Sequence, residues 1–260
     1  WGWSSESYEY ARKKAHEIAV RTARWMESER PDRGDHYYED RPPREEILQE
    51  ILGKNDEPVA IITRNSYGSQ ILNTTALAFI DVDLPMSKKY SWPFSAIRKS
   101  LGKSVDDPRD VAYAKAMETA SLLGEQYTIR MYHTAAGLRF IIVDKYINPK
   151  SSEMEHIFDL FDTDPLYRKL CINQECFRAR LTPKRWRCGI GAPPNRFPWE
   201  NSADEERYRE WQKNYEAKIQ DYATCKWVRR WGAAYGDELQ EKLLKLHDQM
   251  TQAMTDLPLK

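Results

Sequence analysis

The sequence predicts an α+β protein whose core has the β-α-β-β-α-β order of a ferredoxin-like, or split β-α-β, unit. Two observations predict this class. Short runs with period-two alternation of apolar and polar residues, typical of strands, are separated by longer stretches with helical spacing and helix-capping residues. Their order places two helices on one face of an antiparallel sheet and leaves the other face open. The elements are expected, in order, at residues 77–83 (strand), 107–124 (helix), 126–132 and 138–144 (strands), 151–162 (helix) and 175–181 (strand).

An N-terminal segment, residues 1–56, precedes this core. Residues 5–29 carry apolar side chains at helical spacing among alternating charges, which predicts an amphipathic helix. The stretch REEILQEILG, residues 44–53, is predicted to be a short helix that ends at its glycine. Two strand-like runs, PVAIITR and SQILNTT, flank the turn NSYG and are expected to form a hairpin.

The core itself is expected to span residues 57–190. A C-terminal helical extension, residues 191–260, is expected to pack on it, because residues 202–232 and 237–254 both show helical patterns of apolar side chains. A chain of 260 residues can bury a core without the help of disulfides or a metal.

Composition excludes some functions but selects none. Forty Lys and Arg residues balance forty Asp and Glu residues, so no global field draws the chain to nucleic acid or to a membrane. No apolar run is long enough to cross a bilayer, which predicts a soluble, intracellular protein of the cytoplasm without a membrane partner. Close C-x-x-C pairs are absent, so buried free thiols are expected, with a zinc site as the alternative, at Cys171, Cys176, Cys188 and Cys225.

Strand alternation places acidic and basic side chains on the same face of the predicted sheet. Asp81 and Asp83 are one residue apart in the first core strand, so they point to the same side. In the third strand the apolar set suits the helices and leaves Arg139 on the open face, and the same test leaves Arg178 and Arg180 there. The first and third strands are neighbours in this topology, so we expect Arg139 close to the two aspartates.

Two interpretations account for these side chains. Paired carboxylates hold Mg²⁺ or Mn²⁺, and arginines bind the phosphates that such metals also contact. The layout therefore suits phosphoryl or nucleotidyl transfer through a metal-held triphosphate. The alternative is a set of ordinary salt bridges between the aspartates and the arginines on a solvated face.

Three motifs on these strands resemble the archaeo-eukaryotic primase, or primase-polymerase, superfamily, whose catalytic core is an RRM-like sheet. FIDVDLP is similar to the first motif of that family, an acidic hDhDh strand. HTAAGLRFIIV resembles the second, a T-x-x-G-h-H strand after a tight turn, and FRARLTPK resembles an arginine-containing segment that contacts the nucleotide. The resemblance covers roughly residues 59–187.

The resemblance implies roles for individual residues. Asp81 and Asp83 would hold the catalytic Mg²⁺ or Mn²⁺, and Glu175, or Asp164 in a loop, would be the third carboxylate. The chain departs from the family at Arg139, which stands in place of the motif histidine and binds phosphate without titrating near neutral pH. The residues expected at the nucleotide and its phosphates are Thr134, Gly137, Arg139, Arg178, Arg180 and Lys184.

The segment RARLTPKRWRC adds a candidate nucleic-acid contact. Arg185, Trp186 and Arg187 suit a single-stranded backbone with one stacked base, and a charged loop anchored by the tryptophan is the alternative. The predicted function is a metal-dependent nucleotidyltransferase of primase-polymerase type, active or inactive, that takes nucleoside triphosphates and a DNA or RNA strand. A non-catalytic RRM-like module that binds nucleic acid is the main alternative, and a metal-dependent nuclease is a weaker one.

Overall fold

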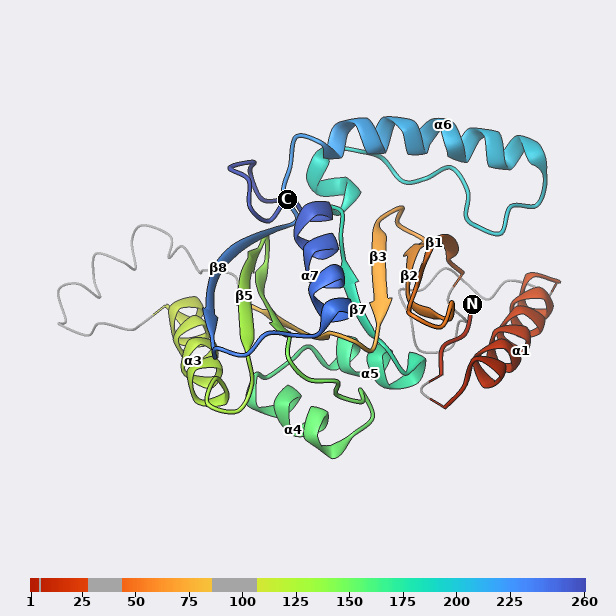
Figure 1. Cartoon of the computed structure of the whole chain (residues 1–260). Coiled ribbons are helices and arrows are strands. Elements are labelled where there is room, and N and C mark those ends of the chain that lie inside the picture. The colour runs from red at the N-terminus through yellow and green to blue at the C-terminus, as the bar shows by residue number, and fades with distance from the viewer. Residues whose placement is uncertain (5, 28–43, 86–106) are drawn as a thin grey trace.

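The computed structural model describes residues 1–4, 6–27, 44–85 and 107–260, which form an α+β fold (Figure 1). The α+β class expected from the sequence is thus confirmed. The helices are α1 (Tyr8–Glu27), α3 (Pro108–Leu123), α4 (Ser152–Leu160), α5 (Pro165–Gln174), the 3₁₀ helix η1 (Arg185–Cys188), α6 (Ser202–Ile219) and α7 (Glu238–Met250). The strands are β1 (Glu46–Leu52), β2 (Pro58–Arg64), β3 (Gln70–Thr74), β4 (Ala78–Asp83), β5 (Ile129–Thr134), β6 (Gly137–Ile142), β7 (Phe177–Arg180) and β8 (Cys225–Trp231).

The strands of the described ranges form two antiparallel sheets of four strands each, with the orders β1-β2-β3-β7 and β4-β6-β5-β8. In the first sheet, Ile71 of β3 lies opposite Arg180 of β7. In the second, Asp81 of β4 lies opposite Arg139 of β6. The expected ferredoxin-like sheet, with β7 paired to β4, is not confirmed, although β7 lies next to β4 where the two sheets meet.

The split into two sheets follows from a bend and from hydrogen bonds beyond the strand ends. Residues 75–77 form a bend between β3 and β4, so these consecutive strands enter different sheets. Past the end of β7, Leu181 N donates to Gln70 O at 2.9 Å, and Gln70 N donates to Thr182 Oγ1 at 2.9 Å. These bonds extend the pairing of β7 along β3 and hold it in the first sheet.

The segment at residues 44–53, predicted to be a helix, contains the edge strand β1 instead. It forms a hairpin with β2 in which Ile51 lies opposite Ala60. The spacing of its isoleucines and leucines suits a helix or a strand, so period alone does not decide. Pairing with the β-branched run PVAIITR decides in favour of the strand.

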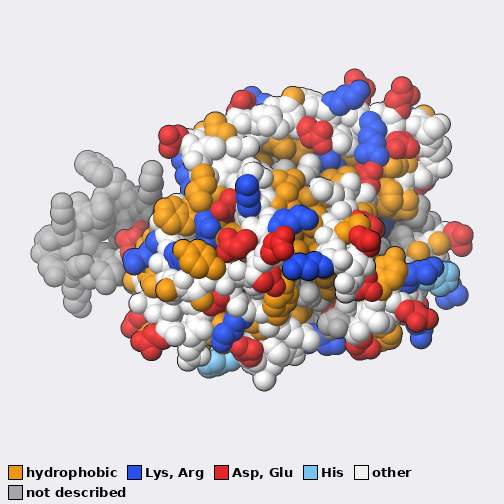
Figure 2. Space-filling view, in the orientation of Figure 1, with side chains coloured by type: hydrophobic (Ala, Val, Ile, Leu, Met, Phe, Trp, Pro, Cys, Tyr) orange, Lys and Arg blue, Asp and Glu red, His pale blue; other side chains and the backbone are white. Residues whose placement is uncertain are grey.

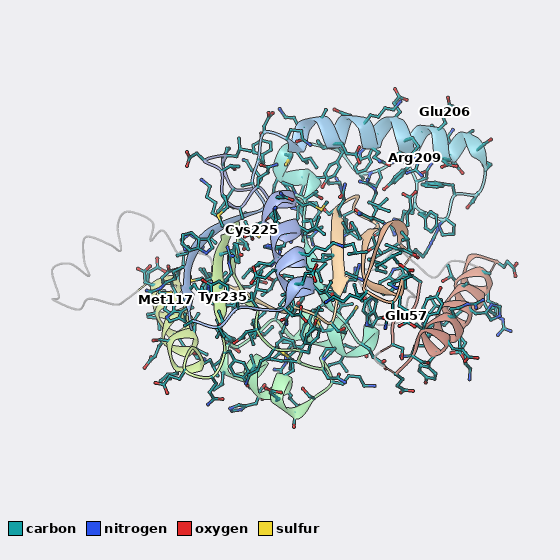
Figure 3. All side chains as sticks on the ribbon, viewed as in Figure 1. Glu57, Met117, Glu206, Arg209, Cys225 and Tyr235 are labelled. Carbon is teal, nitrogen blue, oxygen red and sulfur yellow. The ribbon has the colours of Figure 1, made fainter. Side chains whose placement is uncertain are left out.

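The helix predicted over residues 202–232 is also shorter than expected. α6 ends at Ile219, and β8 follows at the edge of the second sheet, where Cys225 at its start is labelled in Figure 3. The isolated bridge between Ala223 and Leu259 fixes the chain just before β8. Tryptophan, valine and cysteine in CKWVRRW favour a strand once β5 offers a partner, so the helical spacing of the aromatic residues was misleading.

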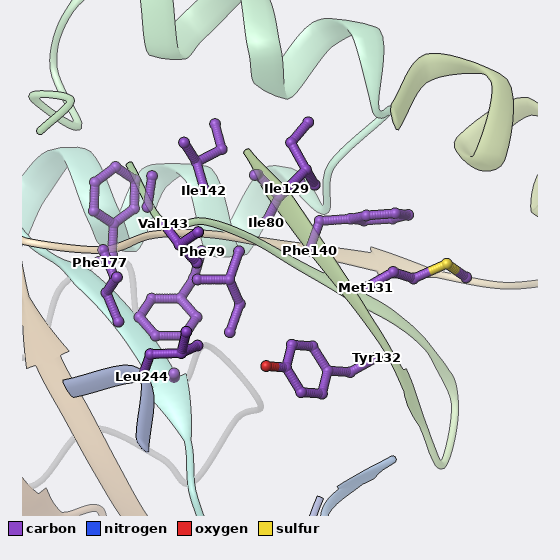
Figure 4. Packing of buried hydrophobic residues seen from close by; sticks show 14 of the residues in the cluster. Phe79, Ile80, Ile129, Met131, Tyr132, Phe140, Ile142, Val143, Phe177 and Leu244 are labelled. Carbon is purple, nitrogen blue, oxygen red and sulfur yellow. The ribbon is translucent and has the colours of Figure 1, made fainter. Parts of the chain in front are cut away.

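Apolar side chains cover both faces of the second sheet. On one face, Phe140 packs against Phe161 at the end of α4, with ring centroids 4.5 Å apart. On the other, Phe79 lies beside Leu244 of α7 (Figure 4), and Ile141 is fully buried. The prediction that this second face stays open was therefore wrong over its apolar part, because these side chains need cover from water as much as those under the helices.

Two further expectations concern free thiols and membrane-spanning helices. Cys171, Cys176, Cys188 and Cys225 are all buried and unpaired, as the spacing predicted. Burial raises the pKa of Cys171 to about 12 and that of Cys225 to about 11, so both thiols stay protonated at neutral pH. Within the described ranges, none of the helices combines the length and the apolar character that a membrane span requires.

Candidate functional site

Asp81 and Arg139 form a two-bonded ion pair between β4 and β6. Arg139 Nε donates to Asp81 Oδ1 at 2.8 Å, and Nη2 donates to Oδ2 at 3.0 Å. The arginine side chain is 4% exposed and the aspartate side chain 33%. The expected closeness of Arg139 to the acidic strand is confirmed, and it takes the form of a bidentate pair in which both carboxylate oxygens already accept a hydrogen bond.

Arg139 also contacts elements outside its own sheet. Its Nη1 donates to Arg180 O at 2.9 Å and lies 3.6 Å from Cys225 Sγ and 3.4 Å from His247 Nε2. Burial alone would lower the pKa of this guanidinium, but the charge and hydrogen bonds of Asp81 hold the pKa above its usual value. Arg139 is thus a fixed cation that joins β4, β6, β7, β8 and α7.

His247 on α7 is the residue at this site that the sequence did not single out. Its Nδ1 lies 3.0 Å from Asp248 Oδ1, and burial lowers the pKa of the imidazole, which is neutral at neutral pH. A neutral imidazole carries one N–H, so donation from Nδ1 to Asp248 leaves Nε2 to accept from Arg139. Asp248 in turn accepts from Tyr132 Oη at 2.7 Å and from Arg130 Nη2 at 2.8 Å.

The signal for this network was present in the amphipathic pattern of α7. Leu243, Leu244, His247 and Thr251 are all buried and recur at helical spacing, so the histidine belongs to the apolar stripe of the helix. A polar side chain on such a stripe needs a buried partner. That requirement pointed to a contact in the sheet but did not identify which one.

Asp83 lies among groups of both charges. Burial raises the pKa of its carboxyl group, and the negative charges of Asp164 and Asp81 raise the pKa further. Lys184 and Arg187 act on it in the opposite direction. Asp164, the loop alternative for the third carboxylate, therefore lies within electrostatic reach of the aspartate pair, where it also caps α5 by accepting from Leu166 N at 3.1 Å.

Lys184 lies among other cations. Burial lowers the pKa of its ammonium group, and the charges of Arg180 and Arg187 lower the pKa further, against the opposing effect of Asp83. Lys184 and Arg180, expected at the phosphates, and Arg187, expected at the nucleic acid, thus lie within electrostatic reach of one another and of Asp83. We call the group formed by Asp81, Asp83, Asp164, Arg180, Lys184 and Arg187 the mixed-charge cluster.

Thr134 and Gly137 hold the turn between β5 and β6 against β4. Gly137 N donates to Thr134 Oγ1 at 3.0 Å. A Cβ added at Gly137 would lie 2.0 Å from Val82 O and 3.1 Å from the Cα of Asp83, so only glycine permits this approach. In the structure these two residues position Asp83, whether or not they also contact a ligand.

Glu175 and Arg178 lie away from the mixed-charge cluster. Glu175 ends α5 in a left-handed conformation with φ 54°, and its carboxylate binds Lys14 at 2.7 Å and Lys150 at 3.0 Å. Arg178 is buried and pairs with the equally buried Glu45 at 2.6 Å. Glu175 lies at the C-terminal end of α5, and Arg178 lies on β7 opposite Asn73 in the first sheet, so the structure does not bring either side chain to the acidic strand.

The basic loop presents an aromatic ring to solvent. Trp186 in η1 is 48% exposed. Lys184 Nζ lies 5.4 Å and Arg185 Cζ 5.5 Å from the centre of its ring, and Tyr67 meets it edge to face at 5.5 Å. Tyr67 comes from the turn NSYG between β2 and β3, and its role here was not predicted. Exposed aromatic rings flanked by cations suit stacking on a nucleobase.

The described residues do not fit the metal centre that the resemblance implies. Both oxygens of Asp81 accept from Arg139, and the expected third carboxylate, Glu175, binds lysines elsewhere. Among the described side chains, no group of three or more His, Cys, Asp or Glu residues is placed to hold a metal ion, which leaves the zinc alternative for the cysteines without support as well.

Comparison with known proteins adds no relative. No protein-family model, no curated protein and no solved structure matches the chain. Figure 2 shows basic and acidic side chains interspersed over the face in view, in keeping with the balanced composition. Function must therefore be inferred from local geometry.

Proposed function

We propose that the protein binds nucleoside phosphates and single-stranded nucleic acid, on a core related to the RRM-like sheet of primase-polymerases. The ligand site would comprise the mixed-charge cluster and the adjoining Trp186. One observation carries this proposal: the indole ring of Trp186 is exposed, and the cations of Lys184 and Arg185 lie 5.4 Å and 5.5 Å from its centre. A charged backbone and a flat base would each find a partner there.

The cations of the cluster favour an incoming phosphate. Burial lowers the pKa of Lys184, and repulsion by the charges of Arg180 and Arg187 lowers it further. A phosphate bound among them would relieve that repulsion and form charge-assisted hydrogen bonds. The aspartates opposite would limit the affinity for free anions, so a base that stacks on Trp186 would supply the remaining affinity.

Stacking of a base adds binding free energy that a salt bridge to phosphate alone does not provide. A base on an exposed aromatic ring contributes about 1–3 kcal/mol to single-strand binding, largely without regard to sequence. Trp186 is half exposed and Tyr67 supports it from the side, so the ring is held ready for such a contact. Little ordering of the ring would then be needed on binding.

Binding without metal chemistry is favoured over catalysis by the pair between Asp81 and Arg139. A divalent cation at Asp81 would compete with a buried guanidinium that makes five contacts of its own, two of them with that carboxylate. The arginine cannot move into water without opening the interface with α7. We therefore propose that the site binds its ligand without catalysing a metal-dependent reaction.

Metal-dependent nucleotidyl transfer is the second candidate. The observation in its favour is the crowding of Asp83 with Asp164 and Asp81, which raises the pKa of Asp83 and would be relieved by Mg²⁺ or Mn²⁺. Primer extension with Mn²⁺ tests it: product from the wild-type protein that is lost in Asp83→Asn would establish catalysis. Cleavage of the labelled strand instead would indicate a nuclease.

The binding proposal is tested by fluorescence anisotropy with a labelled single strand, in EDTA and in several salt concentrations. We expect Trp186→Ala to weaken binding at least fivefold, and Lys184→Gln to weaken it and to reduce the slope of log affinity against log salt by about 0.7. Lys54→Gln, an exposed charge on the β1–β2 hairpin, is the matched control. Equal affinities for the wild type and the first two variants would refute the proposal.

A further inference from the structure

β8 carries the densest run of cations and aromatic rings in the described part of the chain that the proposed site does not use. Residues 225–235, CKWVRRWGAAY, contain one lysine, two arginines, two tryptophans and a tyrosine, and no acid. β8 is the last strand of its sheet and pairs only with β5 among the described strands. Figure 3 labels the two ends of the run, Cys225 and Tyr235.

A register shift in the pairing of β8 with β5 places these side chains on both faces of the sheet edge. Met131 of β5 lies opposite Arg229 and Tyr132 lies opposite Trp227, so Val228 is an extra residue between them. Residues opposite each other in a ladder share a face. The consequence is that Arg229 lies on the α3 face with Met131, whereas Trp227 lies on the α7 face with Tyr132.

The cations of β8 are paired with aromatic rings rather than with acids. Arg229 Cζ lies 4.7 Å from the ring centre of Trp231, and Arg230 Cζ lies 4.5 Å from that of Tyr235. Neither arginine, nor Lys226, forms an ion pair with an acid of the described ranges. Arg229 is exposed, so its N–H groups remain available to a phosphate, whereas Arg230 also donates from Nη2 to Ala234 O and offers only part of its guanidinium.

Two of the three aromatic side chains of this segment are open to solvent, whereas Trp231 packs against the core. Trp227 is 45% exposed and Tyr235 is 75% exposed. Figure 2, drawn in the orientation of Figure 1, shows hydrophobic, basic and acidic side chains next to one another over the region where Figure 1 places β8. Large exposed rings beside unneutralised cations indicate a surface for a ligand that has both negative charge and flat faces.

A hollow beside β5 adds an independent observation. Its volume is about 640 Å³, and it is lined by α7 and by the residues that follow it; the charged groups in its lining are Arg130, Lys245, Glu241 and Asp248. Arg130 lies opposite Arg230 of β8 and is held by Asp248 at 2.8 Å. The volume falls within the range of small-ligand pockets, about 300–1,000 Å³.

We propose that β8 and this hollow form a second contact surface for a single-stranded nucleic acid, separate from the mixed-charge cluster. The inference rests on the proposed function, since it assigns the ligand class of a second surface on the same protein. Phosphates would meet Lys226, Arg229 and Arg230, and bases would stack on Trp227 and Tyr235. An acidic peptide fits less well, because it would leave the exposed rings without a partner.

The test compares a 20-nucleotide oligothymidylate with ATP on the full chain. We expect Trp227→Ala, and the double variant Arg229→Gln with Arg230→Gln, each to weaken binding of the long strand about tenfold or more while ATP affinity stays unchanged. The double variant should also reduce the salt slope by about 1.4. The matched control is Lys13→Gln with Lys54→Gln, which removes two exposed charges far from β8 in sequence.

The outcomes separate this inference from the proposed function. If Lys184→Gln weakens both ligands and the β8 variants weaken neither, the second surface is refuted and the first stands. If the wild-type chain binds the long strand through β8 and does not bind ATP, the mixed-charge cluster fails as the ligand site. Tight binding of poly-glutamate to wild type, lost in the β8 variants, would overturn the choice of nucleic acid.

A second measurement guards against loss of folding. Urea unfolding of each β8 variant should give the wild-type midpoint, since all three side chains to be replaced lie at least partly in solvent. Photo-crosslinking of a 4-thiothymidine strand to the wild-type protein should then label the peptide that contains Trp227. Crosslinks confined to the η1 peptide would refute the second surface even if a variant proved unstable.

Discussion

Replacing Asp81 by asparagine should destabilise the protein far more than the same change at Asp83. Asp81 neutralises Arg139, whose side chain is 4% exposed and cannot reach water without moving α7. Removing one partner of a buried ion pair costs about 3–5 kcal/mol, because the other charge is left uncompensated. Asp81 is itself one-third exposed, so the lower end of that range applies, about 3 kcal/mol.

The neutral amide also introduces a clash of donors. Asparagine can accept at one oxygen only, and its NH₂ group would face Nη2 of Arg139, which now donates to Oδ2 at 3.0 Å. At Asp83, by contrast, neighbouring Asp164 and Asp81 disfavour the charge, so Asp83→Asn should leave stability unchanged or raise it. The two substitutions are identical in chemistry and lie two residues apart, which makes each the control for the other.

Urea unfolding followed by circular dichroism at pH 7 measures the difference. For Asp81→Asn we expect the free energy of unfolding to fall by about 3 kcal/mol with an unchanged m-value, and Tm to fall by about 6–12 °C at 2–4 °C per kcal/mol. Equal losses in the two variants, or no loss at Asp81, would refute the claim that the acidic strand is held by the pair with Arg139.

Three further predictions concern the same region. The pKa of Asp83 is raised in the folded state, so its ionisation opposes folding: stability should fall as pH rises from below 3.8 through the folded pKa, and Asp83→Asn should remove that part of the pH profile. The pKa of His247 is lowered in the folded state, so the protein should lose stability as pH falls below 6.5. His247→Gln should abolish this pH dependence and should lower the free energy of unfolding at pH 8 by about 2 kcal/mol. An unchanged pH profile in the variant would show that the imidazole does not titrate as inferred. Gly137→Ala should lower the free energy of unfolding by about 3 kcal/mol or more in the same urea assay, because the new Cβ would lie 2.0 Å from Val82 O. A wild-type unfolding midpoint would contradict the close approach of that turn to β4.

Period-two alternation predicted the acidic strand and its partner well, because it depends only on the pleat. Asp81 and Asp83 fall on one side of β4, and Arg139 falls opposite Asp81 as the neighbouring strands require. The burial of Phe140 against α4 follows from the same test. These features are properties of one strand or of two adjacent strands, so local pattern is sufficient for them.

The features that the sequence did not predict depend on which elements meet at long range. Arg178 was expected beside the aspartates because β7 was assigned to the sheet of β4, but hydrogen bonds to β3 hold it beside Glu45. His247 was missed because it reaches Arg139 from more than one hundred residues further along the chain. Alternation along a strand specifies the face on which a side chain lies, but not the sheet that the strand joins. Helical spacing specifies which side chains form the buried stripe of a helix, but not the element against which that stripe packs.

A permanently charged arginine beside Asp81 limits what the acidic strand can do. A neutral imidazole beside Asp81 would leave the carboxylate charge available to a cation, whereas the permanent charge of Arg139 neutralises it from within the protein. The guanidinium is held in turn by a backbone carbonyl of β7 and by neutral His247, so the pair is part of the packing between sheet and helix. Lys184 and Arg187, both partly exposed, then lie near the exposed Asp83, and Lys184 lies beside the exposed Trp186. Recognition of a phosphate with an attached base follows from that balance more directly than metal chemistry does.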